Sequence, residues 1–225
     1  MLKVLAIIPA RKGSKGIVGK NSKLIGGKPL VAWTIEAAIN SKFIDKTHVS
    51  TDCLTVKSIA ESYGLKVPRL RPDNLSEDDT TSSSVILFEL LDKNEFDVIC
   101  MLQPTSPLRT SKDIDSALEL FSEFNADSLV SVVEDRHSPY WSFQIKDKYL
   151  KSPFSLNYIN KRRQDLPKTF SLNGAIYISK ISFYKKQKSF LTNETIPYIM
   201  PTNRSIDIDD IDDFKNAEVA LNNIT

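Results

Sequence analysis

Residues 4–21 read Val-Leu-Ala-Ile-Ile-Pro-Ala-Arg-Lys-Gly-Ser-Lys-Gly-Ile-Val-Gly-Lys-Asn, an apolar run followed by a basic loop with three glycines. The run shows no alternation of polar and apolar side chains, which predicts a strand buried on both faces. The loop carries four cations, Arg11, Lys12, Lys15 and Lys20. Cations beside free backbone N–H groups suit a polyphosphate. Because α/β sheets bind ligands beyond the carboxyl ends of their strands, this position favours a ligand site over an ordinary solvated loop.

The loop matches neither of two common phosphate-binding motifs. A Walker loop needs Gly-Lys-Ser/Thr at its end, whereas Gly16 is followed by Ile17. The dinucleotide fingerprint Gly-x-Gly-x-x-Gly is also missing from this stretch. The residue pattern therefore predicts an anion-binding loop without naming its ligand.

Composition places the chain among ordinary globular proteins. It has 225 residues, 41% of them hydrophobic and 26% charged, with a net charge of +2. So small a net charge argues against a nucleic-acid partner held by a dominant basic face. Two cysteines cannot build a disulfide framework, and Cys100 lies in an apolar run that predicts a core position. No signal-peptide pattern or bilayer-length apolar run is visible, so we expect a cytoplasmic protein without a membrane partner.

The order of strands and helices predicts the fold class. Apolar strands alternate with amphipathic helices through short loops, which is typical of an α/β, three-layer, doubly wound and mostly parallel sheet. After the first strand we expect further strands at 47–51, 65–70, 97–102, 128–133, 173–179 and 196–200. Helices are expected near 30–41, 55–63, 85–91, 110–121 and 209–222.

Residues 134–172 differ in amino-acid composition from the rest of the chain. Aromatic, basic and proline residues are mixed there, with a strand expected at 141–145 and no long helix. The stretch is too long for a simple connection in a compact domain. We therefore expect an inserted small β-rich lobe that makes a subunit contact. The catalytic α/β domain would then comprise residues 1–133 and 173–225.

Four polar stretches follow predicted strands, at 9–21, Asp52, 103–109 and 207–210, and should meet at one edge of the sheet. Asp207 and Asp209 alternate with isoleucines, so in an extended segment both carboxylates share one face. Such a pair suits Mg²⁺ held beside substrate phosphates. The alternative is that Asp209 only caps the last helix.

Two further polar sites are ambiguous in the sequence. Arg162 and Arg163 lie in the expected lobe, where a charge run is usually solvated, although guanidinium groups also recognise carboxylates. His48 falls within a predicted strand, which favours packing over catalysis.

A set of motifs taken in chain order resembles one family. The chain resembles the acylneuraminate cytidylyltransferases, or CMP-nonulosonic acid synthetases, from Val4 to about Ala220. The motifs lie at residues 8–21, 27–30, 50–52, 71–72, 102–109, 163–167, 173–178 and 205–209. The resemblance implies a nucleotide-diphospho-sugar transferase-like fold. It also implies an enzyme that joins CTP to a nine-carbon α-keto acid sugar, giving CMP-sugar and pyrophosphate for lipopolysaccharide or capsule biosynthesis.

The resemblance implies a role for each matching residue. CTP would be held by Arg11, Lys20, Asn21, Arg71 and Ser82. The sugar would contact Gln103, Arg163 and Tyr177. The catalytic residues would be Lys15, Arg11 and Asp209. Asp207 and Asp209 would bind the cofactor, Mg²⁺. The partners would be CTP, an acidic nine-carbon sugar and a second copy of the chain, with the lobe exchanged between subunits.

Several alternatives stay open at this point. Ser171 and Leu172 stand where the family often has an arginine, so a legionaminic-type or other nonulosonic acid is as plausible a substrate as N-acetylneuraminic acid. Asp207-Ile208-Asp209 is also a weak match to the metal motif of glycosyltransferases that consume nucleotide sugars. A non-catalytic nucleotide-binding module is the third interpretation, against which the aspartates and the cationic loop both argue.

Overall fold

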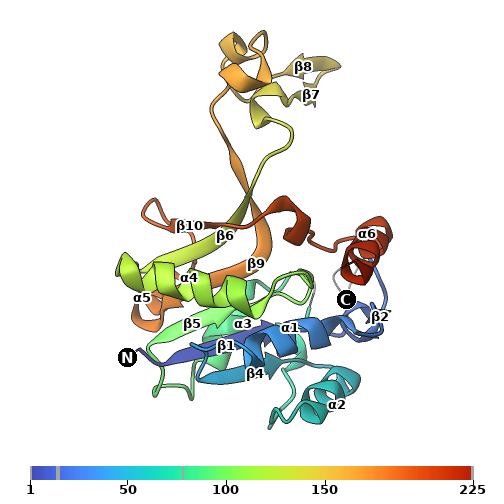
Figure 1. Cartoon of the computed structure of the whole chain (residues 1–225), viewed down its shortest axis with the longest axis vertical. Coiled ribbons are helices and arrows are strands. Elements are labelled where there is room, and N and C mark those ends of the chain that lie inside the picture. Colours follow the sequence, from blue (N-terminus) through green and yellow to red (C-terminus); the bar gives the residue numbers. More distant parts are fainter. Residues whose placement is uncertain (1, 14–15, 78, 224–225) are drawn as a thin grey trace.

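The structure is a computed structural model that describes residues 2–13, 16–77 and 79–223. Among these residues, the centre is a six-stranded sheet of order β10-β6-β9-β5-β1-β4 (Figure 1). The strands are β1 (Val4–Pro9), β4 (Lys46–Ser50), β5 (Val98–Met101), β6 (Ser128–Glu134), β9 (Phe170–Lys180) and β10 (Ile196–Ile199). β1 pairs in parallel with β4 and β5, and β10 in parallel with β6, whereas β9 runs antiparallel to β5 and β6.

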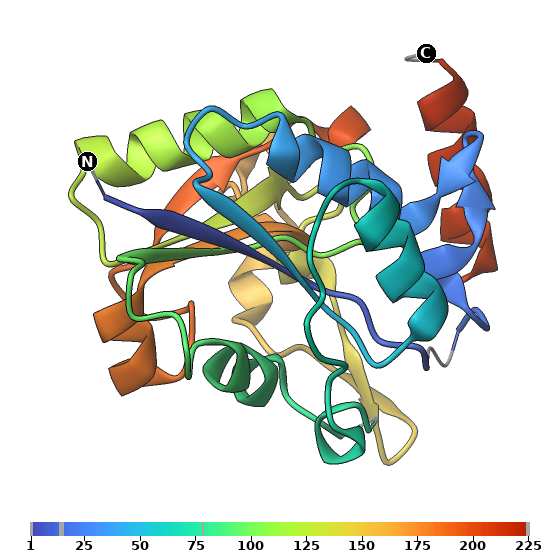
Figure 2. The same cartoon turned by 90° about the horizontal axis from the view of Figure 1, so that it is seen from below.

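Helices cover both faces of the sheet, as Figure 2 shows. One face carries α1 (Leu30–Ile39), α2 (Leu54–Ser62) and α4 (Ser111–Glu123), whose apolar side chains share a core with Val4, Ala6 and Ile8 of β1. The other face carries α3 (Ser82–Glu89) and α5 (Ile181–Gln187), which pack on Leu5 and Ile7. Alternate residues of β1 thus enter opposite cores, as a strand buried on both faces requires. The predicted three-layer α/β fold is confirmed.

A third core holds the basic loop against the end of the chain. Ile17 and the hairpin of β2 (Leu24–Ile25) and β3 (Lys28–Pro29) pack with Ile208 and with α6 (Ile211–Asn222). Ile208 is fully buried in this core. Residues near the two ends of the chain are therefore joined by apolar contact beside the carboxyl ends of β1 and β5.

Residues 135–169 leave the sheet between β6 and β9 and project from the body as an arm (Figure 1). The arm contains the hairpin of β7 (Gln144–Lys146) and β8 (Tyr149–Lys151) and three short 3₁₀ helices, Pro139–Trp141, Leu156–Tyr158 and Arg163–Asp165. Tyr140 stacks with Phe154 and Tyr158 at ring-centroid distances of 4.9 and 4.4 Å, which gives the arm a small core of its own. The projecting segment lies inside the predicted 134–172 lobe.

Two predicted strands were wrong in detail. Residues 65–70 form no strand, because Pro68 has no N–H to donate to a ladder, and Val67 instead packs into the first core from a loop. The strand expected at 141–145 starts only at Gln144, since Pro139 begins a 3₁₀ turn that Ser138 caps. None of the helices in the described ranges is both long and apolar enough to cross a bilayer.

Candidate active site

The basic loop is closed by hydrogen bonds to its own backbone and to the far end of the chain. Asn21 Nδ2 donates to the carbonyl oxygen of Arg11 at 2.9 Å, which ties the end of the loop to its beginning. Gly19 holds φ at +63°, a left-handed conformation that glycine adopts without strain. Lys20 Nζ donates to the carbonyl oxygen of Ile208 at 2.6 Å. The loop is thereby fixed beside the Asp207–Asp209 segment.

A second contact brings the same two segments together. A Cβ atom placed on Gly16 would overlap the backbone carbonyl of Asp209, so only glycine allows this approach. The backbones of the basic loop and of Asp209 are therefore in direct van der Waals contact. This close approach explains why the sequence has a glycine here where neither phosphate-binding motif would require one.

The Asp207 and Asp209 carboxylates both act electrostatically on the Lys20 ammonium group. Burial lowers the pKa of Lys20 below its ordinary value, while the charges of Asp209 and then Asp207 oppose that change. Burial, together with the charge of Asp209, raises the pKa of Asp207, although Thr105 and Lys20 act in the other direction. Both carboxylates therefore lie within electrostatic reach of one loop cation, as expected for side chains on one face of an extended segment.

The last helix does not use Asp209 as its cap. Asp210 is the N-cap of α6, and its side chain accepts hydrogen bonds from the backbone N–H groups of Asp212 and Asp213. The interpretation of Asp209 as a mere helix cap was therefore wrong by one residue. Its exposed carboxylate is left for another partner, since the side chain that accepts at the helix start is that of Asp210.

A bulge in β9 places a glycine against Asp207 and Gln103. The β6–β9 register passes from Val130 opposite Tyr177 to Val132 opposite Leu172, so several β9 residues bulge past Ser131. Gly174, within the bulge, has φ of +72°. A Cβ atom on it would lie 2.6 Å from Asp207 Oδ2 and 2.9 Å from Gln103 Oε1. These two side chains, from different segments, therefore meet over one glycine.

Buried polar side chains hold the bulge in shape. Ser131 Oγ accepts from the N–H of Ile176 at 2.8 Å and donates to Asn173 Oδ1 at 2.6 Å. Arg109 is buried, and its Nη1 donates at 3.1 Å to the carbonyl oxygens of both Gln103 and Ala175. Burial lowers the pKa of Arg109 to about 10. One guanidinium group thus fixes the loop after β5 to the bulge of β9.

The residues present fit a magnesium ion. Within the described part of the chain, Asp207 Oδ1 is a buried oxygen without a hydrogen-bond partner. No cluster of three or more His, Cys, Asp or Glu side chains capable of holding a metal occurs there. Mg²⁺ is commonly held by one or two carboxylates together with substrate phosphates and waters. Asp207 and Asp209 beside a cationic loop match that arrangement.

Two neighbouring pockets lie on either side of Arg11. The smaller, of about 180 Å³, is lined by Arg11, Arg71, Ser82 and Gln103, among others. The larger, of about 680 Å³, is lined by Arg11, Asn21 and Asp52, among others. Asp52 Oδ1 accepts from the backbone N–H of Lys12 at 2.7 Å, so it shapes the loop from the end of β4.

Of the eleven residues with predicted roles, eight gather at this edge of the sheet: Arg11, Lys20, Asn21, Arg71, Ser82, Gln103, Asp207 and Asp209. Lys15 lies outside the described residues. Arg163 is exposed on the arm and lines neither pocket beside Arg11. The Tyr177 ring packs against Phe190, with ring centroids 5.6 Å apart, while burial and the Asp207 charge raise the pKa of its phenol.

Sequence reasoning gave no role to Gly174 or Arg109, although a signal for the first was present. An Asn-Gly pair inside a predicted strand often marks a bulge. His48 is packed, as predicted, and its Nε2 lies 2.8 Å from Glu89 Oε2 in the interior. Glu89 itself was missed, because a lone glutamate on an otherwise apolar helix gives no local sign of its distant partners.

The matches to known proteins agree with this geometry. A family model described as "Cytidylyltransferase" matches residues 5–224. The chain belongs to the cytidylyltransferase family. It is 38% identical over 216 residues to the N-acylneuraminate cytidylyltransferase of Escherichia coli O18:K1:H7, covering 96% of this chain and 51% of that one. It is 37% identical to the CMP-N,N'-diacetyllegionaminic acid synthase of Legionella pneumophila, covering 92% and 91%. The predicted family resemblance is confirmed.

Relatives of the family differ in length and in sugar. The chain spans about half the length of the first relatives it matches, from Escherichia coli and Streptococcus agalactiae. It is 31% identical to a pseudaminic acid cytidylyltransferase of Campylobacter jejuni, covering 97% of this chain and 96% of that one. Among solved structures, a CMP:2-keto-3-deoxy-manno-octonic acid synthetase complexed with CTP aligns with TM-score 0.75 at 15% identity, covering 99% and 100%. That likeness concerns the fold alone.

Proposed function

We propose that this chain is a cytidylyltransferase that activates a nonulosonic acid with CTP, releasing pyrophosphate and giving the CMP-sugar. The observation that carries the proposal is the contact between the basic loop and the aspartate segment, through Lys20 and the carbonyl of Ile208. The loop offers cations to a triphosphate, and the segment offers carboxylates to a metal ion beside it. The names of the family relatives support CTP and the class of sugar.

In the proposed reaction, the anomeric hydroxyl oxygen of the sugar bonds to the α-phosphorus of CTP. The bond from that phosphorus to the oxygen bridging to the β-phosphate breaks in line with the attack, pyrophosphate leaves with the electron pair, and the hydroxyl proton is released to water. Such transfers depend on positioning and charge neutralisation more than on covalent catalysis. Arg11 and Lys20, on the loop, would stabilise the negative charge that builds on the leaving pyrophosphate.

The acceptor sugar would lie where the β9 bulge meets the loop after β5. Gln103 and Asp207 approach the same glycine there. Gln103 would contact polar substituents of the sugar, and Asp207 would face the α-phosphate. Mg²⁺ held by Asp207 and Asp209 would neutralise charge on that phosphate. Arg109 keeps the two sides of this subsite at a fixed separation through its two carbonyl bonds.

The nucleoside part of CTP would occupy the smaller pocket beside Arg71 and Ser82. This pocket is the smaller of the two beside Arg11, and a pyrimidine is the smaller kind of base. We therefore expect CTP to be used far better than ATP or GTP.

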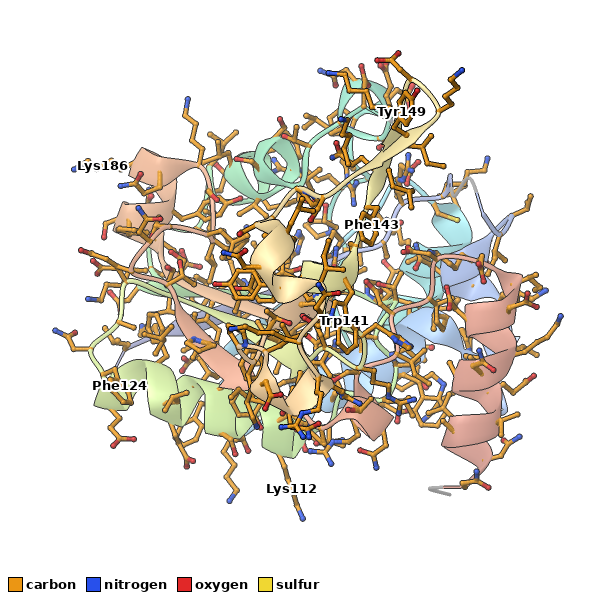
Figure 3. All side chains as sticks on the ribbon, turned by 90° about the horizontal axis from the view of Figure 1, so that it is seen from above. Lys112, Phe124, Trp141, Phe143, Tyr149 and Lys186 are labelled. Carbon is orange, nitrogen blue, oxygen red and sulfur yellow. The ribbon has the colours of Figure 1, made fainter. Side chains whose placement is uncertain are left out.

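The arm supports a homodimer as part of the proposal. Large apolar side chains are exposed along it, and Figure 3 labels three of them, Trp141, Phe143 and Tyr149. Exposed apolar clusters of this kind mark interaction surfaces. Since Arg163 lies on the arm and away from both pockets, a role in sugar binding requires it to reach the site of a second subunit. A cytoplasmic location and a part in surface glycan synthesis complete the proposal.

A pyrophosphate-release assay tests the function directly. The purified chain is incubated with Mg²⁺, one nucleoside triphosphate and one acid from a panel that includes N-acetylneuraminic, N,N'-diacetyllegionaminic and pseudaminic acids. We expect release with CTP and at least one acid, and little with ATP or GTP. Equal turnover of ATP would contradict the nucleotide assignment. Consumption of a nucleotide sugar, with no pyrophosphate released from CTP, would favour a glycosyltransferase, and CTP binding without turnover would favour a non-catalytic module.

A further inference from the structure

A buried polar relay ends at Arg71, in the wall of the smaller pocket. Arg71 is only 5% exposed. Its Nε donates to Ser50 Oγ at 3.0 Å, and its Nη2 donates to the Ser50 carbonyl oxygen. The remaining contact, from Nη1 to the Leu75 carbonyl, is long at 3.4 Å. The edge formed by Nε and Nη2 is therefore anchored on Ser50, and Nη1 is held only by the long contact to Leu75.

Ser50 in turn is oriented by Glu89. The Ser50 hydroxyl donates to Glu89 Oε1 at 2.6 Å while it accepts from Arg71 Nε. A hydroxyl has one proton to donate, so these two bonds fix the direction of its lone pairs. The carboxylate of Glu89 thereby sets which way the hydroxyl faces Arg71.

Glu89 is itself held firmly and remains ionised. It is 3% exposed, and His48 Nε2 lies 2.8 Å from its Oε2. Burial alone would raise the pKa of Glu89, but the bonds to His48 and Ser50 outweigh it and lower that pKa. The negative charge of Glu89 also favours the charged form of Arg71, against the effect of burial. The buried carboxylate therefore supports the guanidinium through one hydroxyl group and through its charge.

Helix α3 lines the pocket at its start and connects to Arg71, through Ser50, at its end. α3 begins at Ser82, which lines the pocket, and ends at Glu89. Helix α3 therefore places Ser82 in the pocket wall and, through Glu89 and Ser50, holds Arg71 as well. His48 Nε2 and Arg69 Nη2 pair with Glu89 Oε2 at 2.8 and 3.9 Å, whereas Ser50 donates to the other oxygen, Oε1, at 2.6 Å.

We infer that Glu89 is a positioning residue for CTP, acting through the Ser50 hydroxyl to hold the Arg71 guanidinium toward the nucleoside pocket. This inference rests on the proposed function. Glu89 does not touch the reacting atoms. Its effect should therefore fall on nucleotide affinity, with the sugar KM and the Mg²⁺ dependence left unchanged.

The test is a double-mutant cycle on CTP affinity. Ser50→Ala removes the bridging hydroxyl and leaves the Glu89–His48 pair in place, while Glu89→Gln keeps the shape and removes the charge. We expect each to raise the Kd of CTP, measured by calorimetry without sugar, by about tenfold, as for a lost charge-assisted hydrogen bond. The double variant should be less than additive, because both changes break one relay.

A matched control separates positioning from general destabilisation. Asp113 is another buried carboxylate, 1% exposed and paired with Arg204, and it contacts no residue of the relay. Asp113→Asn should lower the melting temperature and leave the Kd of CTP within about twofold. Should Glu89→Gln fail to fold, Ser50→Ala, which deletes a single oxygen atom, carries the test alone.

Two results would count against the inference, and they differ. An unchanged Kd of CTP in folded Ser50→Ala, with a wild-type enzyme that releases pyrophosphate, would overturn the role of the relay and leave the proposed function intact. A wild-type chain that neither binds nor turns over CTP would overturn the proposed function and this inference with it.

Discussion

Gly174 joins conformation and chemistry at one residue. Its φ of +72° favours glycine, and the space a side chain would fill is taken by Asp207 Oδ2 and Gln103 Oε1. Gly64 has a similar φ of +79°, yet nothing lies within 4 Å of its missing Cβ. Substitutions at these two glycines therefore distinguish the effect of backbone strain from the effect of displacing site residues.

The first prediction compares these two positions. Gly174→Ala should displace the Asp207 carboxylate and lower kcat by roughly 10² or more, as when one strong electrostatic group is lost. Gly64→Ala should lower the melting temperature through the same backbone strain and leave kcat near the wild-type value. Steady-state kinetics and thermal unfolding of both variants measure this. Equal kcat in the two variants would show that the close contact at Gly174 has no catalytic consequence.

Asp209 gives the second prediction at the scale of a residue. Asp209→Asn keeps the side-chain shape and leaves the Asp210 cap of α6 untouched. We expect a folded protein that binds CTP, with kcat lower by roughly 10² and part of the rate regained at high Mg²⁺ concentration. Asp212→Asn is the control, because it removes a nearby exposed charge that pairs with Lys215 instead. Near-wild-type turnover of Asp209→Asn at low Mg²⁺ would rule out Asp209 as a metal ligand.

At the scale of an element, α4 is fixed at its first turn by a buried carboxylate. Thr110 and Asp113 form a capping box, and Arg204 adds bonds of 3.1 and 2.7 Å to the two Asp113 oxygens. Burial would raise the pKa of Asp113, but the bonds from Arg204 and Thr110 outweigh it and lower that pKa. This pair joins the start of α4 to the segment after β10.

The third prediction follows from the sign of that shift. A carboxyl whose pKa is lower in the folded state stabilises the fold above its unfolded pKa, near 3.9, and loses that contribution as pH falls through the folded value. Asp113→Asn should cost on the order of 3 kcal/mol at neutral pH, as for a broken buried pair. The loss should shrink below about pH 4. Denaturant unfolding from pH 3 to 7 measures it, and a pH-independent loss would contradict the assignment.

Elements were easier to predict than the contacts between them. β1 and the start of α4 could be predicted because each depends on neighbours within a few residues. The strand predicted at 65–70 was wrong because the apolar residues of this stretch were given more weight than Pro68. The meeting of Asp207 with Gln103 over Gly174 could not be predicted, since it depends on a bulge held by Ser131 and Arg109. Such contacts join distant segments, and no local pattern encodes their register.

At the scale of the whole molecule, the arm divides the site residues into two groups. Those on the body gather at the sheet edge, whereas Arg163 lies on the projecting arm (Figure 1). Ile145 and Leu150, on the two strands of the arm hairpin, are 80% and 65% exposed. An apolar surface of this kind is well suited to contact with a second copy of the chain.

The fourth prediction tests whether the arm serves its partner. Arg163→Ala should raise the sugar KM far more than the CTP KM, and Asp209→Asn should lower kcat. If the arm acts in trans, mixing the two variants forms some dimers with one intact site, and activity should return to about a quarter of wild type. Light scattering should show a dimer throughout. No recovery, with subunit exchange demonstrated, would place Arg163 in its own subunit's site or outside any site.

The contact between Lys20 and Ile208 joins residues 188 positions apart, and this separation has a consequence for biosynthesis. Translation adds about 5–20 residues each second, so the basic loop leaves the ribosome on the order of ten seconds or more before its partner segment. During that interval the growing chain displays a cationic loop with no carboxylates opposite it. Competence for the proposed reaction therefore arises late, once residues 207–209 emerge and α6 docks.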